Sequence, residues 1–323
     1  MKVFITGASG LIGSHILKEL INNNYEVTAV KRDTSNMALL TPETRSKVRW
    51  LVGDIFDTQL LYEATKGVDY VIHCAGLISE ANINLMYRVN VEGTANIVNC
   101  CLEAGVKKLI HFGSISALGK TKNGELISET TQWKDGPQNS AYGISKMLGE
   151  REVWRGIAEG LKAVILSPSV VLGMGNGKTG SSIILSLLAK GYKKYPIGGT
   201  AFVDVNDVAK LTLTALESDN ESENYIISGH NKSFRDLMTD FGTALNIKPP
   251  TNVMKKSFLN LIACIDSIFS FITRKPRRIT PTTITQLMRT LNYDNSKSKI
   301  AYNYDYTSWE ATVSRLSKAY MRK

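Results

Sequence analysis

The sequence predicts an α/β protein, with a doubly wound parallel sheet followed by a smaller, mostly helical portion. In the first half of the chain, short apolar runs alternate with amphipathic stretches, the pattern of strands joined by helical crossovers. The first apolar run leads directly into a glycine-rich turn and a helix-like stretch. Beyond Pro168 the alternation loosens, and from about Ser228 helical stretches dominate.

Each expected strand is a short apolar run, and the helices lie between these runs. We expect strands at Val3–Thr6, Glu26–Val30, Val48–Val52, Asp69–His73, Lys108–Phe112, Leu161–Leu166 and, late in the chain, Tyr225–Ile227. We expect helices from the glycine-rich turn to about Asn22 and at Asp57–Lys66, Asn84–Ala104 and Ser140–Glu159. Asp57 is a suitable N-cap, and Gly105 is suited to end the third of these helices.

The composition is that of a globular protein, with 43% apolar and 21% charged residues. No apolar run reaches the roughly 18 residues of a membrane span, and an expected first strand near Lys2 leaves no room for a signal peptide. The four cysteines lack C-x-x-C spacing, which predicts reduced thiols in a cytoplasmic protein. The four histidines lack ligand-type spacing, so we expect no metal site. These residues are Cys74, Cys100, Cys101 and Cys264, and His15, His73, His111 and His230.

The net charge of +10 and the pI of about 9.3 suit an anionic partner: nucleic acid, anionic lipid or an anionic cofactor. The basic residues are scattered, and only Arg274–Arg278 is a dense cluster. No recognition helix, zinc finger or stacked-aromatic motif accompanies that cluster. We therefore do not expect nucleic-acid binding.

Thr6–Gly13 contains the spacing G-x-x-G-x-x-G, directly after a strand and at the start of a helix. Glycine allows a sharp turn, and it lets a pyrophosphate approach the free N–H groups of the helix N-terminus. An ordinary tight turn is the alternative, but the position at the start of a βαβ unit favours a Rossmann-type dinucleotide site. The expected cofactor contacts in this loop are Gly7, Gly10, Leu11, Ile12 and Gly13. We assign residues 1–168 to this domain, with a later strand near 225–227, and residues 169–323 mainly to substrate binding.

The end of the second strand indicates which dinucleotide binds. An acidic residue there would accept hydrogen bonds from a ribose 2′-hydroxyl and would repel a 2′-phosphate. This strand instead runs into Lys31 and Arg32, which suit the 2′-phosphate of NADP. NAD stays an alternative because Asp33 is adjacent and within reach of the ribose.

Tyr142 and Lys146 form a Y-x-x-x-K pair on one face of an expected helix. A nearby ammonium and an oxidised nicotinamide would favour the phenolate, so we expect a lowered pKa for Tyr142. The phenol could then transfer a proton during hydride transfer, and Lys146 could also donate to the nicotinamide ribose. Ser114 follows the fifth strand, where ligands of doubly wound sheets bind, and could hold the substrate oxygen. The predicted catalytic residues are Ser114, Tyr142 and Lys146.

Together these motifs resemble the extended, epimerase-like branch of the short-chain dehydrogenase/reductase family over nearly the whole chain. The resembling segments are Thr6–Gly13, Gly53–Ile55, His73–Gly76, Asn90–Thr94, Tyr142–Lys146, Ser167–Gly173 and Phe202–Ala209. The resemblance implies further cofactor contacts at Asp54, Ile55, Cys74, Ala75, Gly76, Pro168 and Val171. It leaves Asn90 as either a water-holding relay to Lys146 or a helix-packing residue. Gly113 departs from the Ser or Thr of many relatives, and we expect no effect of this on the chemistry.

Within this branch the chain is most similar to the dihydroflavonol reductase and 3-beta-hydroxysteroid dehydrogenase-like group, through Val30–Asp33. This implies an NADP(H)-dependent oxidoreductase acting on a carbonyl or secondary alcohol of a small, nonpolar substrate. A nucleotide-sugar epimerase or dehydratase is one alternative. It is disfavoured by Lys31 and by the absence of an Asp-Glu pair after Ser114. A non-catalytic NADP-binding sensor is another, disfavoured by the Tyr142/Lys146 pair.

The apolar stretch Phe258–Ile272 and the basic cluster after it have two interpretations. One is a helix packed over a nonpolar substrate pocket. The other is an interfacial helix, so that residues 258–278 would make peripheral contact with an anionic membrane. For assembly, the resemblance suggests a homodimer through the helices Asn84–Ala104 and Ser140–Glu159, with a monomer as the alternative.

Overall fold

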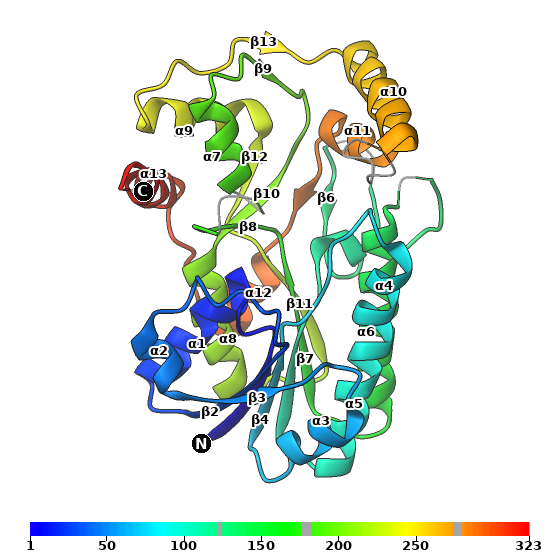
Figure 1. The fold of residues 1–323 in the computed structure, drawn as a ribbon, viewed down its shortest axis with the longest axis vertical. Coiled ribbons are helices and arrows are strands. Elements are labelled where there is room, and N and C mark those ends of the chain that lie inside the picture. The colour runs from blue at the N-terminus through cyan, green and yellow to red at the C-terminus, as the bar shows by residue number, and fades with distance from the viewer. Residues whose placement is uncertain (122–123, 138, 176–181, 274–279, 323) are drawn as a thin grey trace.

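A seven-stranded sheet is the centre of the larger of two lobes, shown at the bottom of Figure 1. The computed structural model describes residues 1–121, 124–137, 139–175, 182–273 and 280–322. The strand order is β11-β7-β5-β4-β1-β2-β3, and every neighbouring pair is parallel. These strands are β1 (Lys2–Thr6), β2 (Glu26–Lys31), β3 (Val48–Val52), β4 (Tyr70–His73), β5 (Lys108–Phe112), β7 (Ala163–Pro168) and β11 (Glu223–Ile227). The predicted doubly wound fold is confirmed, and the order reverses between β1 and β4.

Both faces of this sheet are covered by helices, because alternate residues of each buried strand point to opposite faces. In β1, Val3 and Ile5 belong to one apolar cluster and Phe4 to another. The first cluster includes side chains of α1 (Leu11–Asn22), α8 (Val205–Glu217) and α12 (Ser296–Tyr302). The second includes those of α3 (Thr58–Thr65), α5 (Gly93–Ala104) and α6 (Ala141–Ala158).

Local signals placed several helix ends correctly. The Asp57 carboxylate accepts a hydrogen bond from the Leu60 backbone N–H at 3.0 Å and so caps α3. Gly105 ends α5 at φ +62°, in the left-handed region that glycine adopts without strain. The Ser140 hydroxyl caps α6 by accepting from the Gly143 N–H at 3.0 Å.

The expected single helix Asn84–Ala104 is divided in the structure. α4 (Ile83–Tyr87) leads into a π-helical turn, Arg88–Glu92, and α5 follows without a break in the chain direction. A π-turn adds one residue to a helical turn and changes which side chains face a neighbouring helix. Asn90 lies in this turn, is 1% exposed and faces α6.

The smaller lobe contains strands that the sequence did not reveal. β8 (Val170–Leu172), β10 (Gly199–Asp204) and β12 (His230–Ser233) form a three-stranded sheet. It shares an apolar cluster with α7 (Ser182–Ala189), α9 (Phe234–Ala244) and α13 (Trp309–Met321). Two short strand pairs are β6 (Leu126–Ile127) with β14 (Asn292–Tyr293), and β9 (Lys194–Tyr195) with β13 (Asn252–Val253). The other helices are α2 (Pro42–Ser46), α10 (Lys256–Thr273) and α11 (Pro281–Met288).

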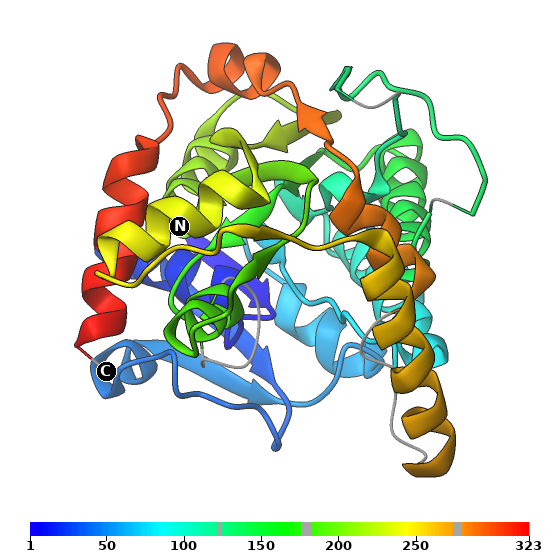
Figure 2. The same ribbon diagram turned by 90° about the horizontal axis from the view of Figure 1, so that it is seen from above.

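The C-terminal portion is nevertheless mostly helical, as predicted. Most of it lies above the carboxyl ends of the large sheet, whereas β11, α8 and α12 belong to the larger lobe (Figure 1). Figure 2 shows α10 at the periphery, beside α11. In the part of the chain that the structure describes, no helix combines the length and apolar character needed to cross a bilayer. The basic cluster Arg274–Arg278 falls within residues 274–279, outside the described residues.

Candidate active site

The predicted site residues come from segments far apart in sequence but lie at one edge of the large sheet. Because all seven strands are parallel, their carboxyl ends meet at the same edge, below the smaller lobe (Figure 1). That edge carries Gly7 after β1, Lys31 and Arg32 at the end of β2, Asp54 and Ile55 after β3, Cys74, Ala75 and Gly76 after β4, Ser114 after β5 and Pro168 at the end of β7. The reversal of strand order lies in the middle of this edge, where doubly wound sheets bind their ligands.

The glycine loop is packed so closely that no side chain fits at Gly7 or at Gly13. Gly7 has φ +73°, and a Cβ there would lie 2.6 Å from the Ala75 nitrogen. A Cβ on Gly13 would lie 2.3 Å from the Gly7 oxygen. Gly10 precedes α1 and provides no side-chain cap, so the first N–H groups of this helix point to the edge of the sheet without a capping side chain. These features fit a group that brings its own negative charge, such as a pyrophosphate.

A buried hydrogen-bond relay holds β1, β4 and α5 together behind this loop. The Ala75 N–H donates to the Thr6 hydroxyl at 3.2 Å, and that hydroxyl lies 2.7 Å from His73 Nδ1. On the other side of the ring, His73 Nε2 lies 3.1 Å from the Thr94 hydroxyl, which donates to the Asn90 carbonyl at 2.8 Å. One arrangement satisfies every donor: a neutral imidazole that accepts at Nδ1 and donates from Nε2.

The physical environment of His73 agrees with that neutral form. Burial lowers the pKa of this imidazole to about 3, and the Lys146 charge acts in the same direction. The neutral ring therefore links Thr6, at the start of the glycine loop, to Thr94, which bonds to Asn90 in the π-turn.

Lys31 lies close to the turn that follows β3. The Gly53 N–H donates to the Lys31 carbonyl at 3.0 Å, so the expected adenine-side turn Gly53–Ile55 is adjacent to the two cations. The Arg32 backbone N–H donates to the Ser35 hydroxyl at 3.0 Å, while the Arg32 side chain is exposed. Across the described part of the chain, no carboxylate lies within ion-pairing distance of either cation.

Ile55 fixes this turn against α5. The Ile55 side chain is buried, and a Cβ at Gly93 would lie 2.3 Å from Ile55 Cδ1. The Asn96 side-chain amide donates to the Ile55 carbonyl at 3.0 Å. Asp54 is half-buried and accepts from the Phe56 N–H at 3.3 Å.

Asn90 anchors the segment that follows the strand-end motif of β4. Its side-chain oxygen Oδ1 accepts from the Leu77 N–H at 2.8 Å. Its side-chain amide donates to the Leu77 carbonyl at 2.9 Å and to the Ser145 hydroxyl at 2.9 Å. Both amide hydrogens are therefore used within the protein. Of the two interpretations of Asn90, the structure supports packing, which holds Gly76 and Leu77 against α6.

The structure brings Tyr142 and Ser114 together. Tyr142 lies in the first turn of α6, Ser114 lies just after β5, and their hydroxyl groups are hydrogen-bonded. Burial raises the pKa of the Tyr142 phenol, the hydrogen bond to Ser114 partly opposes this, and the Glu150 charge adds to the rise. The sequence analysis expected a lowered pKa for Tyr142. In the structure of the chain alone this pKa is raised, because desolvation of the phenolate is the largest effect. At neutral pH the phenol is protonated and able to donate.

Lys146 lies one helical turn after Tyr142 and is 5% exposed. Its ammonium donates to the Phe112 carbonyl at the end of β5, which leaves donors for further partners. Burial lowers the pKa of Lys146, and the carboxylate of Glu150 opposes that shift. The position that a Cβ of Gly76 would occupy is 4.0 Å from the ammonium nitrogen, so the strand-end motif of β4 and the helix pair adjoin each other.

Glu150 is the charged group of this region that the sequence analysis missed. It lies one helical turn beyond Lys146 and is 6% exposed. The signal was available, since residues four apart on a helix share a face, and a carboxylate in that position is rarely buried without a reason.

The segment after β7 lies beside the first turn of α1. Pro168 is buried at the end of its strand, and Val171 is half-buried in β8 and packs against the first apolar cluster. A Cβ on Gly173 would lie 2.9 Å from Leu11 Cδ1. The expected nicotinamide-side segment and the glycine loop are therefore adjacent.

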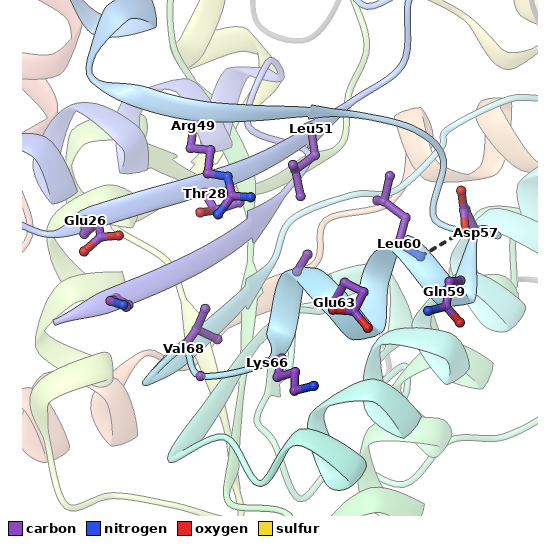
Figure 3. A pocket seen from close by; sticks show the side chains of 13 residues that line it. Glu26, Thr28, Arg49, Leu51, Asp57, Gln59, Leu60, Glu63, Lys66 and Val68 are labelled. Carbon is purple, nitrogen blue, oxygen red and sulfur yellow. Dashed lines mark hydrogen bonds between the residues drawn. The ribbon is translucent and has the colours of Figure 1, made fainter.

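A separate groove of about 440 Å³ lies between α3 and the strands β2 and β3 (Figure 3). Figure 3 shows that Thr28, Arg49 and Leu51 line it from the strands and Leu60 and Glu63 from the helix. None of the predicted site residues lines this groove. Within the described residues, no three His, Cys, Asp or Glu side chains gather as metal ligands would.

Comparison with known proteins places this arrangement among nucleotide-dependent enzymes. Residues 3–228 match the profile of the family described as "NAD dependent epimerase/dehydratase family". A Synechocystis sp. protein provisionally named dihydroflavonol 4-reductase is 28% identical over 260 residues, which cover 78% of this chain and 74% of that protein.

Two solved structures show the same fold over nearly the whole chain. The crystal structure of gox2253 has a TM-score of 0.84 at 29% identity, covering 99% of this chain and 97% of that one. The dTDP-glucose 4,6-dehydratase DesIV from Streptomyces venezuelae, solved with NAD bound, has a TM-score of 0.81 at 20% identity, covering 100% and 98%. The family resemblance drawn from the motifs is confirmed.

Proposed function

Because the chain belongs to the NAD-dependent epimerase/dehydratase family, we propose that it is an NADP(H)-dependent oxidoreductase that interconverts a carbonyl and a secondary alcohol. The observation that carries this proposal is the hydrogen bond between the Tyr142 and Ser114 hydroxyls, one helical turn from the buried Lys146 ammonium. A proton donor, an oxygen-binding hydroxyl and a cation at a strand-end edge are the groups that carbonyl reduction needs.

The chain's own geometry supports the dinucleotide assignment. The close backbone contacts of Gly7 and Gly13 hold the loop in a tight turn, and the start of α1 provides N–H donors for the phosphates of a dinucleotide. We assign Lys31 and Arg32 to the 2′-phosphate, and Asp54, Ile55, Cys74, Ala75 and Gly76 to the adenosine side. Leu11, Ile12, Pro168 and Val171 would contact the rest of the cofactor. When bound, the nicotinamide supplies or accepts the hydride.

The residues around the reacting oxygen have separate roles in this proposal. Ser114 holds the substrate oxygen close to the Tyr142 hydroxyl. Tyr142 donates its proton to a carbonyl oxygen during reduction and takes a proton from an alcohol in the reverse direction. Lys146 stabilises the negative charge that the phenol acquires when it donates, and it would also donate to the nicotinamide ribose.

We propose a small, nonpolar substrate, bound mainly by residues 169–323 above the cofactor domain of residues 1–168. The relative named as a reductase and the cations at Lys31 and Arg32 favour a reductase over a nucleotide-sugar enzyme. A cytoplasmic location is part of the same proposal and is supported by four cysteines that are all free thiols.

A substrate screen tests the activity. Purified protein is incubated with NADPH and a panel of aldehydes, ketones and flavonoid- or steroid-like carbonyls, with UDP-sugars as a separate arm. Oxidation of NADPH by at least one carbonyl is the expected result. Conversion of a UDP-sugar without net cofactor oxidation would favour an epimerase. Binding of NADPH without turnover of any compound would favour a sensor.

Cofactor choice is tested at Arg32. We expect Arg32→Asp to weaken NADPH binding by about 100-fold, because it removes a cation and adds a repelling charge beside the 2′-phosphate. NADH, which lacks this phosphate, should bind within about threefold of wild type. Titration calorimetry with both cofactors measures this, and Arg45→Asp is the matched control. Equal losses for NADPH and NADH would remove Arg32 from the proposed phosphate site.

We further propose that α10 makes peripheral contact with an anionic membrane surface. Phe258, Leu261, Ile265 and Phe269 are 37%, 58%, 58% and 54% exposed, and their spacing puts them on one face of the helix. Lys194 lies over the Phe258 ring at 3.7 Å, which places a cation beside this face. An apolar helical face with adjacent cations suits the boundary between acyl chains and anionic headgroups.

Cosedimentation with vesicles tests this contact. Wild type should bind vesicles that contain phosphatidylserine more strongly than pure phosphatidylcholine. The variant Leu261→Ser/Ile265→Ser/Phe269→Ser should bind at least about tenfold more weakly, because each apolar side chain inserted contributes on the order of 1.5 kcal/mol. Ile300→Ser, at a residue that is 80% exposed on α12, is the control. No binding by wild type in low salt, or equal binding by the triple variant, would contradict the proposal.

For assembly, we propose a homodimer through the faces of α5 and α6 that point away from the sheet. Trp154 on α6 is 40% exposed, which supports a partner at this surface. Light scattering of the purified chain measures the mass, and a monomer at micromolar concentration would contradict the proposal.

A further inference from the structure

A buried carboxylate lies directly behind the proposed catalytic residues. Glu150 is 6% exposed, and its carboxylate accepts a hydrogen bond from the Ser114 backbone N–H and contacts the Ser167 hydroxyl. The Glu150 Oε1 atom has no hydrogen-bond partner among the described residues. Burying an ionisable group with an unused acceptor costs free energy, so a role in the site would explain why this residue is a carboxylic acid.

Gly113 makes the space for this carboxylate. A Cβ at position 113 would lie 2.3 Å from Glu150 Oε1 and 2.7 Å from the Ser167 hydroxyl oxygen. Both distances are too short for any real side-chain carbon. The chain therefore cannot hold the present Glu150 position and also carry a side chain at position 113. The expectation that Gly113 has no effect on the chemistry stays a prediction, and this packing makes it worth testing.

Several titratable groups surround Glu150 in the structure. On its own helix are Tyr142 and Lys146. The Glu150 charge raises the pKa of both groups, and the Lys146 charge lowers the pKa of Glu150. At the sheet, the Lys146 charge acts on His73 at the end of β4, on Cys74 just after it and on His111 in β5, and it lowers the pKa of each. Burial lowers the pKa of both imidazoles, so these rings are neutral. Burial also raises the pKa of the Cys74 thiol, which leaves it uncharged.

Burial raises the pKa of Glu150 to about 7, and the Lys146 charge opposes that rise. Where Glu150 is ionised, the two charges that can balance one another are therefore those of Lys146 and Glu150. They share a face of α6, yet the Lys146 ammonium donates to the Phe112 carbonyl and makes no direct ion pair with Glu150 among the described residues. Without a direct ion pair, the Glu150 charge can still change the pKa of Lys146 strongly, because little water screens two charges in the low-dielectric interior.

We propose that Glu150 is a positioning residue for the Ser114–Tyr142–Lys146 group, and that Gly113 is the residue that admits its carboxylate. The carboxylate fixes the Ser114 backbone where the substrate oxygen would bind, and its charge keeps the buried Lys146 ammonium protonated. This inference rests on the proposed oxidoreductase function, and it assigns no substrate contact to Glu150.

The sign of the pH effect follows from the directions of the shifts. The Glu150 charge raises the pKa of Lys146 and also raises the pKa of Tyr142. Without that charge both pKa values fall, so the ammonium and the protonated phenol are both lost at lower pH. Reduction needs the protonated phenol. As the pH is raised, reductase activity should therefore begin to fall at a lower pH in a variant without the charge than in wild type.

The variant Glu150→Gln tests this directly, because it keeps the shape and an acceptor for the Ser114 N–H but removes the charge. We expect the alkaline limb of the kcat profile to move down by about one pH unit, which is about a tenfold loss of kcat on that limb. KM for NADPH should stay within about twofold, since no cofactor contact changes. Glu150→Asp should restore part of the profile. Glu152→Gln, at a surface residue paired with Arg155, is the matched control and should leave the profile unchanged. Superimposable profiles for wild type and Glu150→Gln would overturn the proposal.

The role of Gly113 is tested by a double-mutant cycle that does not need turnover. Gly113→Ser and Glu150→Ala are each expected to destabilise the fold, and the double variant should be more stable than the sum of the two losses predicts, because removing the carboxylate makes room for the new Cβ. Urea unfolding measures all four proteins. Additive losses would overturn the assignment of Gly113. If no carbonyl is reduced by wild type, the proposed function fails, and this cycle still reports on the contact.

Discussion

Replacing Tyr142 with Phe should lower kcat by about 10³-fold, within the range that general acid–base catalysis contributes. Tyr142 is the proposed acid, and its hydroxyl is hydrogen-bonded to the Ser114 hydroxyl that would hold the substrate oxygen. Phe keeps the ring and its packing and removes only that proton. NADPH binding should stay within a few-fold of wild type, because the glycine loop and the cations after β2 are unchanged.

The measurement is steady-state reduction of whichever carbonyl the screen identifies, combined with calorimetric binding of NADPH. Tyr62→Phe is the matched control, at a half-buried tyrosine of α3 that is not among the predicted site residues. That control should retain full activity. Turnover within about threefold of wild type in Tyr142→Phe would show that this residue is not the acid, whatever the cofactor does.

Of the substitutions proposed for this protein, Asp207→Ala should produce the largest loss in the free energy of unfolding. Asp207 is 1% exposed in the first turn of α8. Its carboxylate accepts hydrogen bonds from the Tyr304 hydroxyl at 2.9 Å, the Thr307 N–H at 2.9 Å and the Thr307 hydroxyl at 2.6 Å. These contacts fasten the link between α12 and α13 to the helix that packs on α1. Alanine would leave three buried donors without an acceptor.

Hydrogen bonds to a charged group are worth roughly 1.5–3 kcal/mol each, and partial relaxation reduces their sum, so we expect a loss of about 4 kcal/mol in the free energy of unfolding. This corresponds to a fall in Tm of about 10 °C. Calorimetry and urea unfolding measure it. Asp305→Ala is the control, since its side chain is 99% exposed and lies 3.6 Å from Lys299, and it should change stability by less than about 0.5 kcal/mol. A Tm for Asp207→Ala within about 2 °C of wild type would contradict this account of the link.

The sequence was informative where function and fold depend on local patterns. The inner strands β1, β4, β5 and β7 are largely apolar because inner parallel strands are buried on both faces, and such runs are visible without knowing their partners. The N-caps at Asp57 and Ser140 and the left-handed Gly105 are set by neighbours in the chain. The glycine loop was recognisable for the same reason, since a tight turn before a helix needs its glycines in fixed places.

Features that depend on distant partners were not predictable. β8, β10 and β12 are short and belong to a lobe whose apolar face is completed by α9 and α13. The π-turn at Arg88–Glu92 occurs inside a sequence with ordinary helical periodicity. It contains Asn90, whose side-chain partners Leu77 and Ser145 come from other segments of the chain.

The sequence by itself determined the doubly wound fold, the glycine loop and the pairing of Tyr142 with Lys146, because each depends on residues within a few positions of one another. Only the tertiary structure decided the protonation of the site. Whether the phenol at Tyr142 is neutral depends on how much water the sheet edge excludes, and whether Lys146 keeps its charge depends on a carboxylate that fits only because position 113 has no side chain. Solvation and packing are properties of the folded chain, so no local pattern records them.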